Sequence, residues 1–188
     1  MIGDKNVIAF ISGGVRSGKS NFAERMALSF FAKEERKHLY YIATAESAGD
    51  REMEGRIKRH RDGREKAWTT IEEPVRIDQA IRRIESGAVV LIDCLTVWTS
   101  NVLFSEGKDG ATLAERMEGL LQEAERKNLV LILVSNDLNE EAPIRDPFIQ
   151  GYVRSLETVH RIAVTYADSA IQVIAGQPVY WKGEGQAV

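Results

Sequence analysis

The sequence contains a single cysteine, Cys94, so it can form neither an internal disulfide nor a metal site built from clustered cysteines. No apolar stretch approaches the ~20 residues that a membrane-spanning helix needs, and the first residues do not read as a signal peptide. Lys and Arg together number 25 against 28 Asp and Glu, which argues against a protein that coats nucleic acid through its overall charge. We therefore expect a soluble, cytoplasmic protein with no nucleic-acid partner. Any site that binds phosphate must depend on a local group of residues and not on the overall charge.

The length and composition are those of a globular chain. With 188 residues, against about 150 per domain, the chain is expected to form one domain over residues 1–188. Its 44% hydrophobic and 28% charged residues exclude a disordered or fibrous protein. Cys94 lies in an apolar run and is expected to be a buried core thiol.

Apolar runs of strand length alternate with helical patterns along the chain. Helical spacing is visible in Phe22, Met26 and Phe30, and again in a stripe from Leu113 to Ala124, while 107–110 reads as a surface loop. The apolar runs are continuous and β-branched, which is typical of strands covered on both faces. This alternation predicts an α/β fold, a mostly parallel sheet with helices on both faces. The expected strands are residues 7–11, 39–43, 88–94, 129–134 and 170–175.

A glycine-rich motif directly after the first expected strand carries the most information. It fits G-x-x-x-x-G-K-[ST] and runs into a helical pattern that begins at Asn21. Its glycines let backbone N–H groups point inward as an anion nest, and the following helix adds its positive end. Lys19 is then expected to reach the β- and γ-phosphates of a nucleotide, and the Ser20 hydroxyl to bind Mg²⁺. The motif residues are Gly13, Gly14, Val15, Arg16, Ser17, Gly18, Lys19 and Ser20.

Asp93 is the candidate second ligand for the metal. It ends the apolar run Val89 to Ile92, and the carboxyl ends of central strands are where open α/β sheets bind ligands. The alternative is that Asp93 caps a helix beginning near Thr96. Together with the glycine-rich motif, the Mg²⁺ role is the favoured interpretation.

A basic segment surrounds His60. Between Arg56 and Lys66 there are six cationic and two acidic side chains, a local charge of +4. At helical spacing Glu52, Arg56 and His60 share one face, so the segment can pack and still present the imidazole. Neighbouring arginines disfavour the imidazolium and leave a neutral, nucleophilic His60 beside donors suited to a triphosphate. A solvated helical face is the alternative, and structural roles are expected for His38 and His160.

These residues resemble a known family, the bifunctional adenosylcobinamide kinase / adenosylcobinamide-phosphate guanylyltransferases of cobalamin biosynthesis. The resemblance covers roughly the first three quarters of the chain. It is most specific in the His60 segment followed by Trp68 and Glu72. The matching stretches are residues 13–20, Tyr41 to Thr44, Glu52-Met53, Arg56-Ile57, His60 to Arg64, Trp68, Thr70 to Glu72, Leu91 to Thr96, Asn101, Phe104 and Val134 to Asn136.

The resemblance implies a P-loop NTPase fold, often assembled as a homotrimer, with two activities that use GTP and ATP. One phosphorylates adenosylcobinamide; the other takes GMP from GTP onto a histidine, here matching His60, and passes it to adenosylcobinamide phosphate. Catalytic roles are thus expected for His60 and Lys19, and metal roles for Ser20 and Asp93. The nucleotide contacts implied beyond residues 13–20 are Ala43, Thr44, Arg61, Asp62, Gly63, Arg64, Glu72 and Asp93.

Two stretches depart from the family pattern. After Ser135-Asn136 the run from Asp137 to Pro143 lacks the glycines that family members carry in this turn, and His160-Arg161 stands where they tend to have Asn-Gln. Both departures concern the acceptor side. Two other functions remain open as alternatives to the bifunctional transferase: a P-loop small-molecule kinase without guanylyl transfer, and a nucleotide-binding switch without transfer activity.

Overall fold

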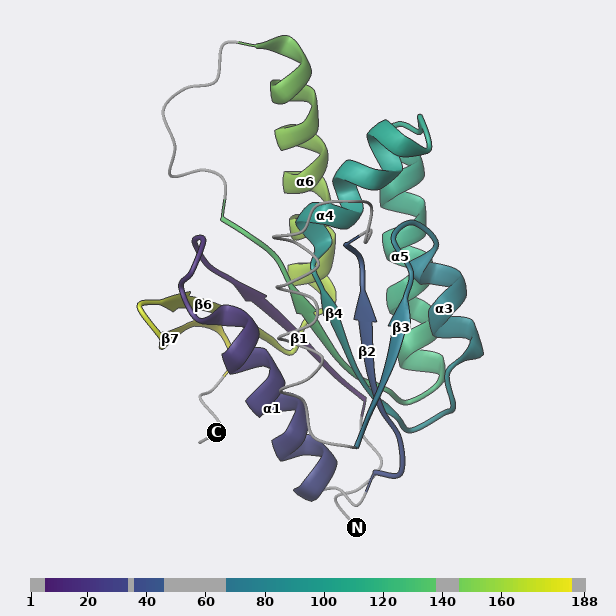
Figure 1. Cartoon of the computed structure of the whole chain (residues 1–188), viewed down its shortest axis with the longest axis vertical. Coiled ribbons are helices and arrows are strands. Elements are labelled where there is room, and N and C mark those ends of the chain that lie inside the picture. Colours follow the sequence, from purple (N-terminus) through teal and green to yellow (C-terminus); the bar gives the residue numbers. More distant parts are fainter. Residues whose placement is uncertain (1–5, 34–35, 46–66, 138–145, 184–188) are drawn as a thin grey trace.

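Seven strands form one sheet in the computed structural model, which describes residues 6–33, 36–45, 67–137 and 146–183 (Figure 1). The strand order is β3-β2-β4-β5-β1-β6-β7. All neighbours pair in parallel except β6 and β7, which are antiparallel. The strands are β1 (Val7–Ser12), β2 (Leu39–Ala43), β3 (Trp68–Glu72), β4 (Val89–Asp93), β5 (Val130–Val134), β6 (Ser169–Ile174) and β7 (Gln177–Lys182).

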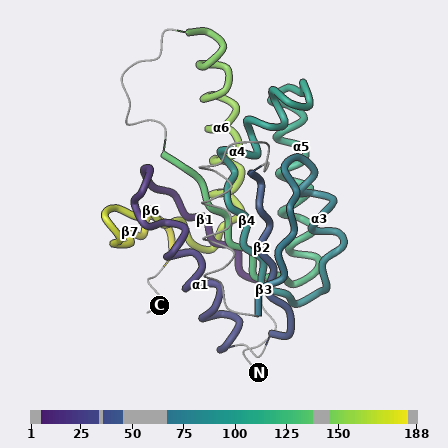
Figure 2. The backbone as a smooth tube through the Cα atoms, viewed as in Figure 1, coloured from purple at the N-terminus to yellow at the C-terminus, as the bar shows by residue number. Residues whose placement is uncertain are grey.

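Alternate side chains of the strands build two cores, one on each face of the sheet. Ala9 and Ile11 point to the face covered by α1 (Lys19–Lys33), where they meet Phe22 and Met26. Ile8 and Phe10 point to the opposite face. That face is covered by α3 (Ile77–Arg83), α4 (Leu95–Ser100), α5 (Gly110–Arg126) and α6 (Pro147–Tyr166), with the π-helix η1 (Asn101–Ser105) continuing α4. In Figures 1 and 2, α1 accordingly lies apart from the four other helices.

The fold prediction is confirmed, with differences at the edges. All five expected strands are present within one or two residues, but β3 and β7 were not predicted. Both are edge strands with no buried residue, so the continuous apolar run that marks a covered strand is missing. The first helix begins at Lys19, two residues before the predicted start. The expected loop is shorter than predicted, because Asp109 caps α5 by accepting a hydrogen bond from Thr112 N at 2.9 Å and Gly110 already belongs to the helix.

The register brings the carboxyl ends of the parallel strands to one edge. Ala43 lies opposite Glu72 on one side and Asp93 on the other. Asp93 in turn lies opposite Val134, and Val134 opposite Ile11. The glycine-rich motif and the predicted contacts Ala43, Glu72 and Asp93 therefore share the edge where α/β sheets bind ligands.

Candidate functional site

The glycine-rich motif forms a tight loop between β1 and α1. A Cβ at Gly13 would lie 2.6 Å from both the Ser17 Oγ and the Val173 carbonyl oxygen, so only glycine fits there. Gly18 has φ +91°, a conformation that side chains disfavour. Ser17 N donates to the Gly14 carbonyl at 3.2 Å and closes the turn. The loop therefore has the close backbone approach that a phosphate cradle needs.

Lys19 is the first residue of α1 and is 8% exposed. Its Nζ donates to the Gly14 carbonyl oxygen at 3.1 Å, which folds the side chain back over the loop. Ser20 follows on the first turn of the helix, where backbone N–H groups have no partner within the helix. The ammonium group, the hydroxyl and the helix N-terminus are thus grouped at one loop, as the motif predicted.

The loop is held by backbone contacts to two other segments. Asp137 N, just after β5, donates to the Gly13 carbonyl at 3.1 Å, and Gly176 N, in the β6–β7 turn, donates to the Ser17 carbonyl at 2.8 Å. The Asp137 carboxylate itself accepts a hydrogen bond from Gln172 Nε2 at 2.9 Å. The two backbone contacts could not be predicted from the sequence, because each joins residues more than 100 positions apart.

The Asp93 carboxylate, at the end of β4, accepts a hydrogen bond from the Tyr41 hydroxyl at 2.9 Å. Helix α4 starts from Cys94, whose side chain makes no capping hydrogen bond. The alternative in which Asp93 caps this helix is therefore not what the structure shows. The half-buried Asp93 instead lies at the same sheet edge as the glycine-rich motif, residues 13–20, which we call the P-loop. Tyr41 fixes one of the Asp93 oxygens.

Thr44 joins the end of β2 to the residue after Asp93. Its hydroxyl donates to the Cys94 carbonyl at 2.9 Å and accepts from Cys94 N at 2.8 Å. Thr44 is fully buried, and Ala43 beside it is 9% exposed. The Thr44 side chain thus holds the β4 terminus in place, so any nucleotide contact at Ala43 and Thr44 falls to the backbone.

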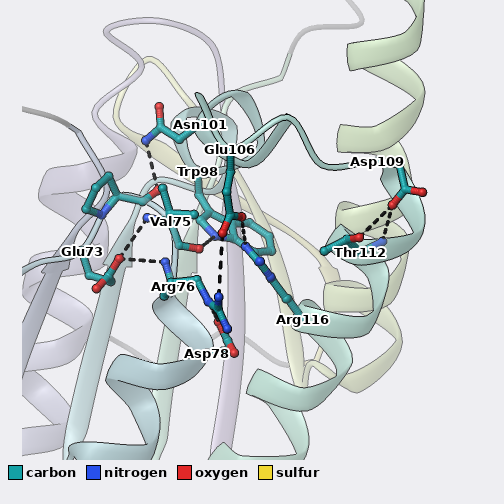
Figure 3. Close-up of polar contacts among 11 residues, drawn as sticks. Glu73, Val75, Arg76, Asp78, Trp98, Asn101, Glu106, Asp109, Thr112 and Arg116 are labelled. Atoms are coloured by element: carbon teal, nitrogen blue, oxygen red, sulfur yellow. Dashed lines mark hydrogen bonds and ion pairs between the residues drawn. The ribbon is translucent and has the colours of Figure 1, made fainter. Parts of the chain in front are cut away.

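Asn101 holds the same region from the side of η1. Its Nδ2 donates to the Thr44 carbonyl at 2.9 Å and to the Pro74 carbonyl at 3.0 Å. One amide group thereby joins the end of β2 to the loop that follows Glu72, and Figure 3 shows its bond to that loop. Glu72 itself is exposed at the end of β3.

The loop between β3 and α3 carries further braces. The Glu73 carboxylate accepts hydrogen bonds from Val75 N at 3.1 Å and Arg76 N at 2.7 Å, while Trp98 Nε1 donates to the Val75 carbonyl at 2.8 Å. Trp98 is fully buried, so this loop is anchored in the core. Figure 3 shows Glu73 bonded to the backbone of this loop, and Trp98 of α4 and Asn101 of η1 contacting the loop.

An ion-pair group lies beyond that loop. Glu106 sits 2.6 Å from Arg116 and 3.8 Å from Arg76, which itself lies 3.7 Å from Asp78. The hydrogen bond from Arg116 lowers the pKa of Glu106, with help from the charges of both arginines. The pairs tie η1 to α3 and α5 behind the site.

Two titratable groups near the edge stay neutral. Burial raises the pKa of the half-buried Cys94 to about 11, and the neighbouring Asp93 charge adds to the effect. Burial lowers the pKa of His160 to about 4, against the opposing charge of Asp137. Neither a thiolate at Cys94 nor an imidazolium at His160 is present at neutral pH.

Several predicted site residues lie outside the described residues: His60, Arg61, Asp62, Gly63 and Arg64. Their roles remain predictions. Within the described residues no group of three or more His, Cys, Asp and Glu side chains could hold a metal ion on its own. Helices in that part of the chain are also too short or too polar to span a membrane.

Solved structures of low sequence identity share the fold. The flagellar accessory protein FlaH from Methanocaldococcus jannaschii superimposes with a TM-score of 0.54 at 16% identity, covering 94% of this chain and 78% of that one. A KaiC-like protein from Pyrococcus horikoshii gives 0.53 at 15% identity, covering 89% and 71%. Both support the P-loop NTPase fold.

Sequence comparison gives the family. The bifunctional adenosylcobalamin biosynthesis protein CobP of Pseudomonas aeruginosa is 36% identical over 175 residues, 93% of this chain and 96% of that protein. The bifunctional adenosylcobalamin biosynthesis protein CobU of Escherichia coli is 36% identical over 104 residues, 55% of this chain and 54% of that protein. Residues 9–180 match the family described as cobinamide kinase / cobinamide phosphate guanyltransferase. The resemblance seen in the sequence is confirmed: the chain belongs to the cobinamide kinase / cobinamide phosphate guanyltransferase family.

Proposed function

We propose that this protein catalyses two steps on one edge of its sheet: phosphorylation of adenosylcobinamide, and transfer of GMP from GTP to adenosylcobinamide phosphate. Family membership supports the reaction class. The observation that carries the site assignment is the folded P-loop, with Lys19 over it, at the same sheet edge as Asp93. Nucleotide binding is therefore assigned to residues 13–20, Ala43, Thr44, Glu72 and Asp93, together with Arg61 to Arg64.

The P-loop residues bind and orient the triphosphate. The backbone N–H groups of the loop and of the first turn of α1 donate to the β- and γ-phosphates. Lys19 exchanges its hydrogen bond with the Gly14 carbonyl for a phosphate oxygen, which places a positive charge where negative charge develops during transfer. The backbone braces at Gly13 and Ser17 hold this geometry before the nucleotide arrives.

The residues present suit Mg²⁺. Proteins usually bind this ion through one or two side-chain oxygens, while phosphates and water supply the other ligands. The Ser20 hydroxyl and the Asp93 carboxylate would hold it, and Tyr41 fixes one Asp93 oxygen. When bound, Mg²⁺ offsets phosphate charge at the reacting phosphorus.

His60 is the proposed nucleophile. An imidazole nitrogen forms a bond to the α-phosphorus of GTP while the bond to the bridging oxygen breaks, and pyrophosphate leaves with the electron pair. A phosphate oxygen of adenosylcobinamide phosphate then attacks the same phosphorus, which breaks the N–P bond and frees the imidazole. Arg61 and Arg64 are proposed to offset the charge during both displacements. The products are pyrophosphate and adenosylcobinamide-GDP.

We further propose that residues 1–188 act as one domain, in the cytoplasm, as a homo-oligomer such as a trimer. Small-molecule substrates are consistent with the family. Size-exclusion chromatography with light scattering gives the number of subunits directly.

Labelling with GTP radioactive at the α-phosphate tests the proposal. Label retained after denaturation, labile in acid and stable in base, is expected for a phosphoramidate on His60. The His60→Ala variant should lose the label and keep at least part of its cobinamide phosphorylation, and His38→Ala serves as the matched control. Phosphorylation of cobinamide without any label would favour a small-molecule kinase. Tight nucleotide binding with neither reaction would favour a nucleotide-binding switch.

A further inference from the structure

A chain of side-chain hydrogen bonds crosses the sheet edge beside the P-loop. Thr96 Oγ1, at the start of α4, lies 3.0 Å from Ser135 Oγ, just after β5. Ser135 Oγ lies 2.6 Å from Nε2 of His160 on α6. Thr96 is 8% exposed, Ser135 is fully buried and His160 is half-buried, and the three residues link α4, β5 and α6.

The hydroxyl protons of this chain can be arranged in two directions. Thr96 Oγ1 already accepts a hydrogen bond from Asn136 N at 2.8 Å. If Thr96 then donates to Ser135, and Ser135 donates to His160, each hydroxyl proton among the described residues has one acceptor. In the opposite direction Ser135 donates to Thr96, and Thr96 donates to its other side-chain partner, Cys94. We assign the first direction, in which Nε2 of His160 is the acceptor and the ring proton is on Nδ1, and the tautomer measurement below tests it.

His160 has the properties that such an acceptor needs. Its ring packs against Phe10 of β1 with centroids 5.1 Å apart, which fixes the ring orientation. Burial favours the neutral ring, in which one of the two nitrogens carries a free lone pair and can accept a hydrogen bond. The charged group facing it is Asp137, from the segment after β5.

The chain ends on the segment that contacts the P-loop. Asn136 is held through its backbone N–H, and the next residue, Asp137, donates its own N–H to the Gly13 carbonyl. The Asp137 carboxylate is oriented from the other side by Gln172, which in turn accepts from Trp181 Nε1 at 3.2 Å. His160 is thus connected through hydrogen bonds to Asn136 and Asp137, which lie beside the P-loop.

We propose that His160 is a positioning residue that sets, through Ser135 and Thr96, where Asn136 and Asp137 stand beside the bound nucleotide during transfer. This inference rests on the proposed function. The link reaches the loop only through the Asp137 N–H on the Gly13 carbonyl and makes no contact with the phosphate-binding N–H groups, so it acts on turnover more than on nucleotide binding. Small misplacements of such a segment lower kcat strongly.

The test is kinetic and uses the full chain. His160→Leu should lower the kcat of cobinamide phosphorylation by roughly 10- to 100-fold while the KM for the nucleotide changes by less than about threefold. His160→Gln, which puts an acceptor oxygen near the place of Nε2, should restore most of the rate. Ser135→Ala should resemble His160→Leu, and the double variant should be no slower than either alone, since both break one link. His38→Leu, at an exposed histidine, is the control.

An NMR measurement keeps the inference testable without activity. The ¹⁵N chemical shifts of His160 in the wild-type protein should identify the Nδ1–H tautomer, and Ser135→Ala should shift the Nε2 resonance. An Nε2–H tautomer, or an active wild type whose His160→Leu variant keeps a normal kcat and a folded circular-dichroism spectrum, would overturn the positioning role alone. A wild type that binds nucleotide and has neither activity would overturn the proposed function and, with it, any role in turnover.

Discussion

The two halves of the functional edge are held together by different means. On the P-loop side, the loop is braced by backbone groups, Asp137 N on the Gly13 carbonyl and Gly176 N on the Ser17 carbonyl. On the side of β2, β3 and β4, side chains do this work, above all Thr44 and Asn101. The geometry of the P-loop therefore depends on small residues that let backbone segments come close together. The geometry at the ends of β2, β3 and β4 depends on particular polar side chains.

This difference predicts opposite responses to substitution. Backbone braces survive most side-chain changes but fail where a Cβ intrudes. Side-chain braces fail as soon as the donor or acceptor is removed. Each of the following experiments tests one half against the other.

Removal of the Lys19 ammonium should have the largest effect on activity. Lys19→Ala takes away the charge held over the loop and should lower both activities by roughly 10³-fold or more, with the fold retained. Initial rates of cobinamide phosphorylation and of self-guanylylation measure this. Lys33→Ala, at the exposed end of the same helix, should change neither rate. Near-normal turnover in a folded Lys19→Ala protein would contradict the P-loop assignment.

A matched pair of glycines tests the close approach on the P-loop side. A Cβ at Gly13 meets a backbone oxygen at 2.6 Å, whereas nothing lies within 4 Å of a Cβ at Gly14. We expect Gly13→Ala to lower the free energy of unfolding by about 3 kcal/mol and to weaken GTP binding, and Gly14→Ala to leave stability nearly unchanged. Urea titration gives the two stabilities. Equal effects at both positions would show that the loop does not pack as described.

The half-buried imidazole of His160, behind the P-loop, should make stability fall in acid. Its folded pKa of about 4 lies below the ordinary value of 6.5, so between these pH values the unfolded chain binds a proton that the folded chain does not. The free energy of unfolding should therefore fall as pH drops below 6.5, by about 3 kcal/mol in total near pH 4. His160→Gln should remove this part of the pH dependence, and the control His38→Gln should keep it. An unchanged pH profile for His160→Gln would show that other groups cause the loss.

On the other half, Asn101 is the side chain whose removal should matter most for stability. Asn101→Ala deletes two part-buried hydrogen bonds to backbone carbonyls and should cost about 2 kcal/mol. It should also raise the KM for the nucleotide, because the ends of β2 and β3 lose their common anchor. Thermal unfolding and nucleotide titration measure both. Asn101→Asp should be worse, since it sets a carboxylate against two carbonyl oxygens, and Gln122→Ala on the exposed face of α5 should have little effect.

The same contrast explains what the sequence could predict. The P-loop and its adjoining strand were readable because glycine spacing and a continuous apolar run are local signals. The partnership of Tyr41 with Asp93 and of Thr44 with Cys94 depends on the pairing of β2 with β4, which brings together residues about 50 positions apart. Nothing in a single sequence records that register.

The link through His160 was missed for a related reason. Structural roles were expected for this histidine because it lacks a cluster of cationic side chains like the one around His60. Its partners come from β5 and α4, and its neutrality comes from burial, both of which exist only in the folded chain. The edge strands β3 and β7 were missed because half-exposed strands carry a weaker apolar pattern.

The smallest expected effect tests whether the orientation of Asp93 matters once the strands are in place. Tyr41→Phe removes one hydrogen bond to the carboxylate and leaves the ring packed against Trp68, so it should cost about 1 kcal/mol of unfolding free energy. The concentration of Mg²⁺ that supports half-maximal activity should rise by about threefold, because Asp93 must then be ordered at the moment of binding. Tyr40→Phe is the matched control on the same strand, since its hydroxyl contacts Glu85 away from the site. If both variants change the Mg²⁺ requirement equally, Tyr41 does not act through Asp93. If Tyr41→Phe changes stability alone, the carboxylate is held well enough by the β4 terminus, and the side-chain half of the edge is more rigid than its hydrogen bonds suggest.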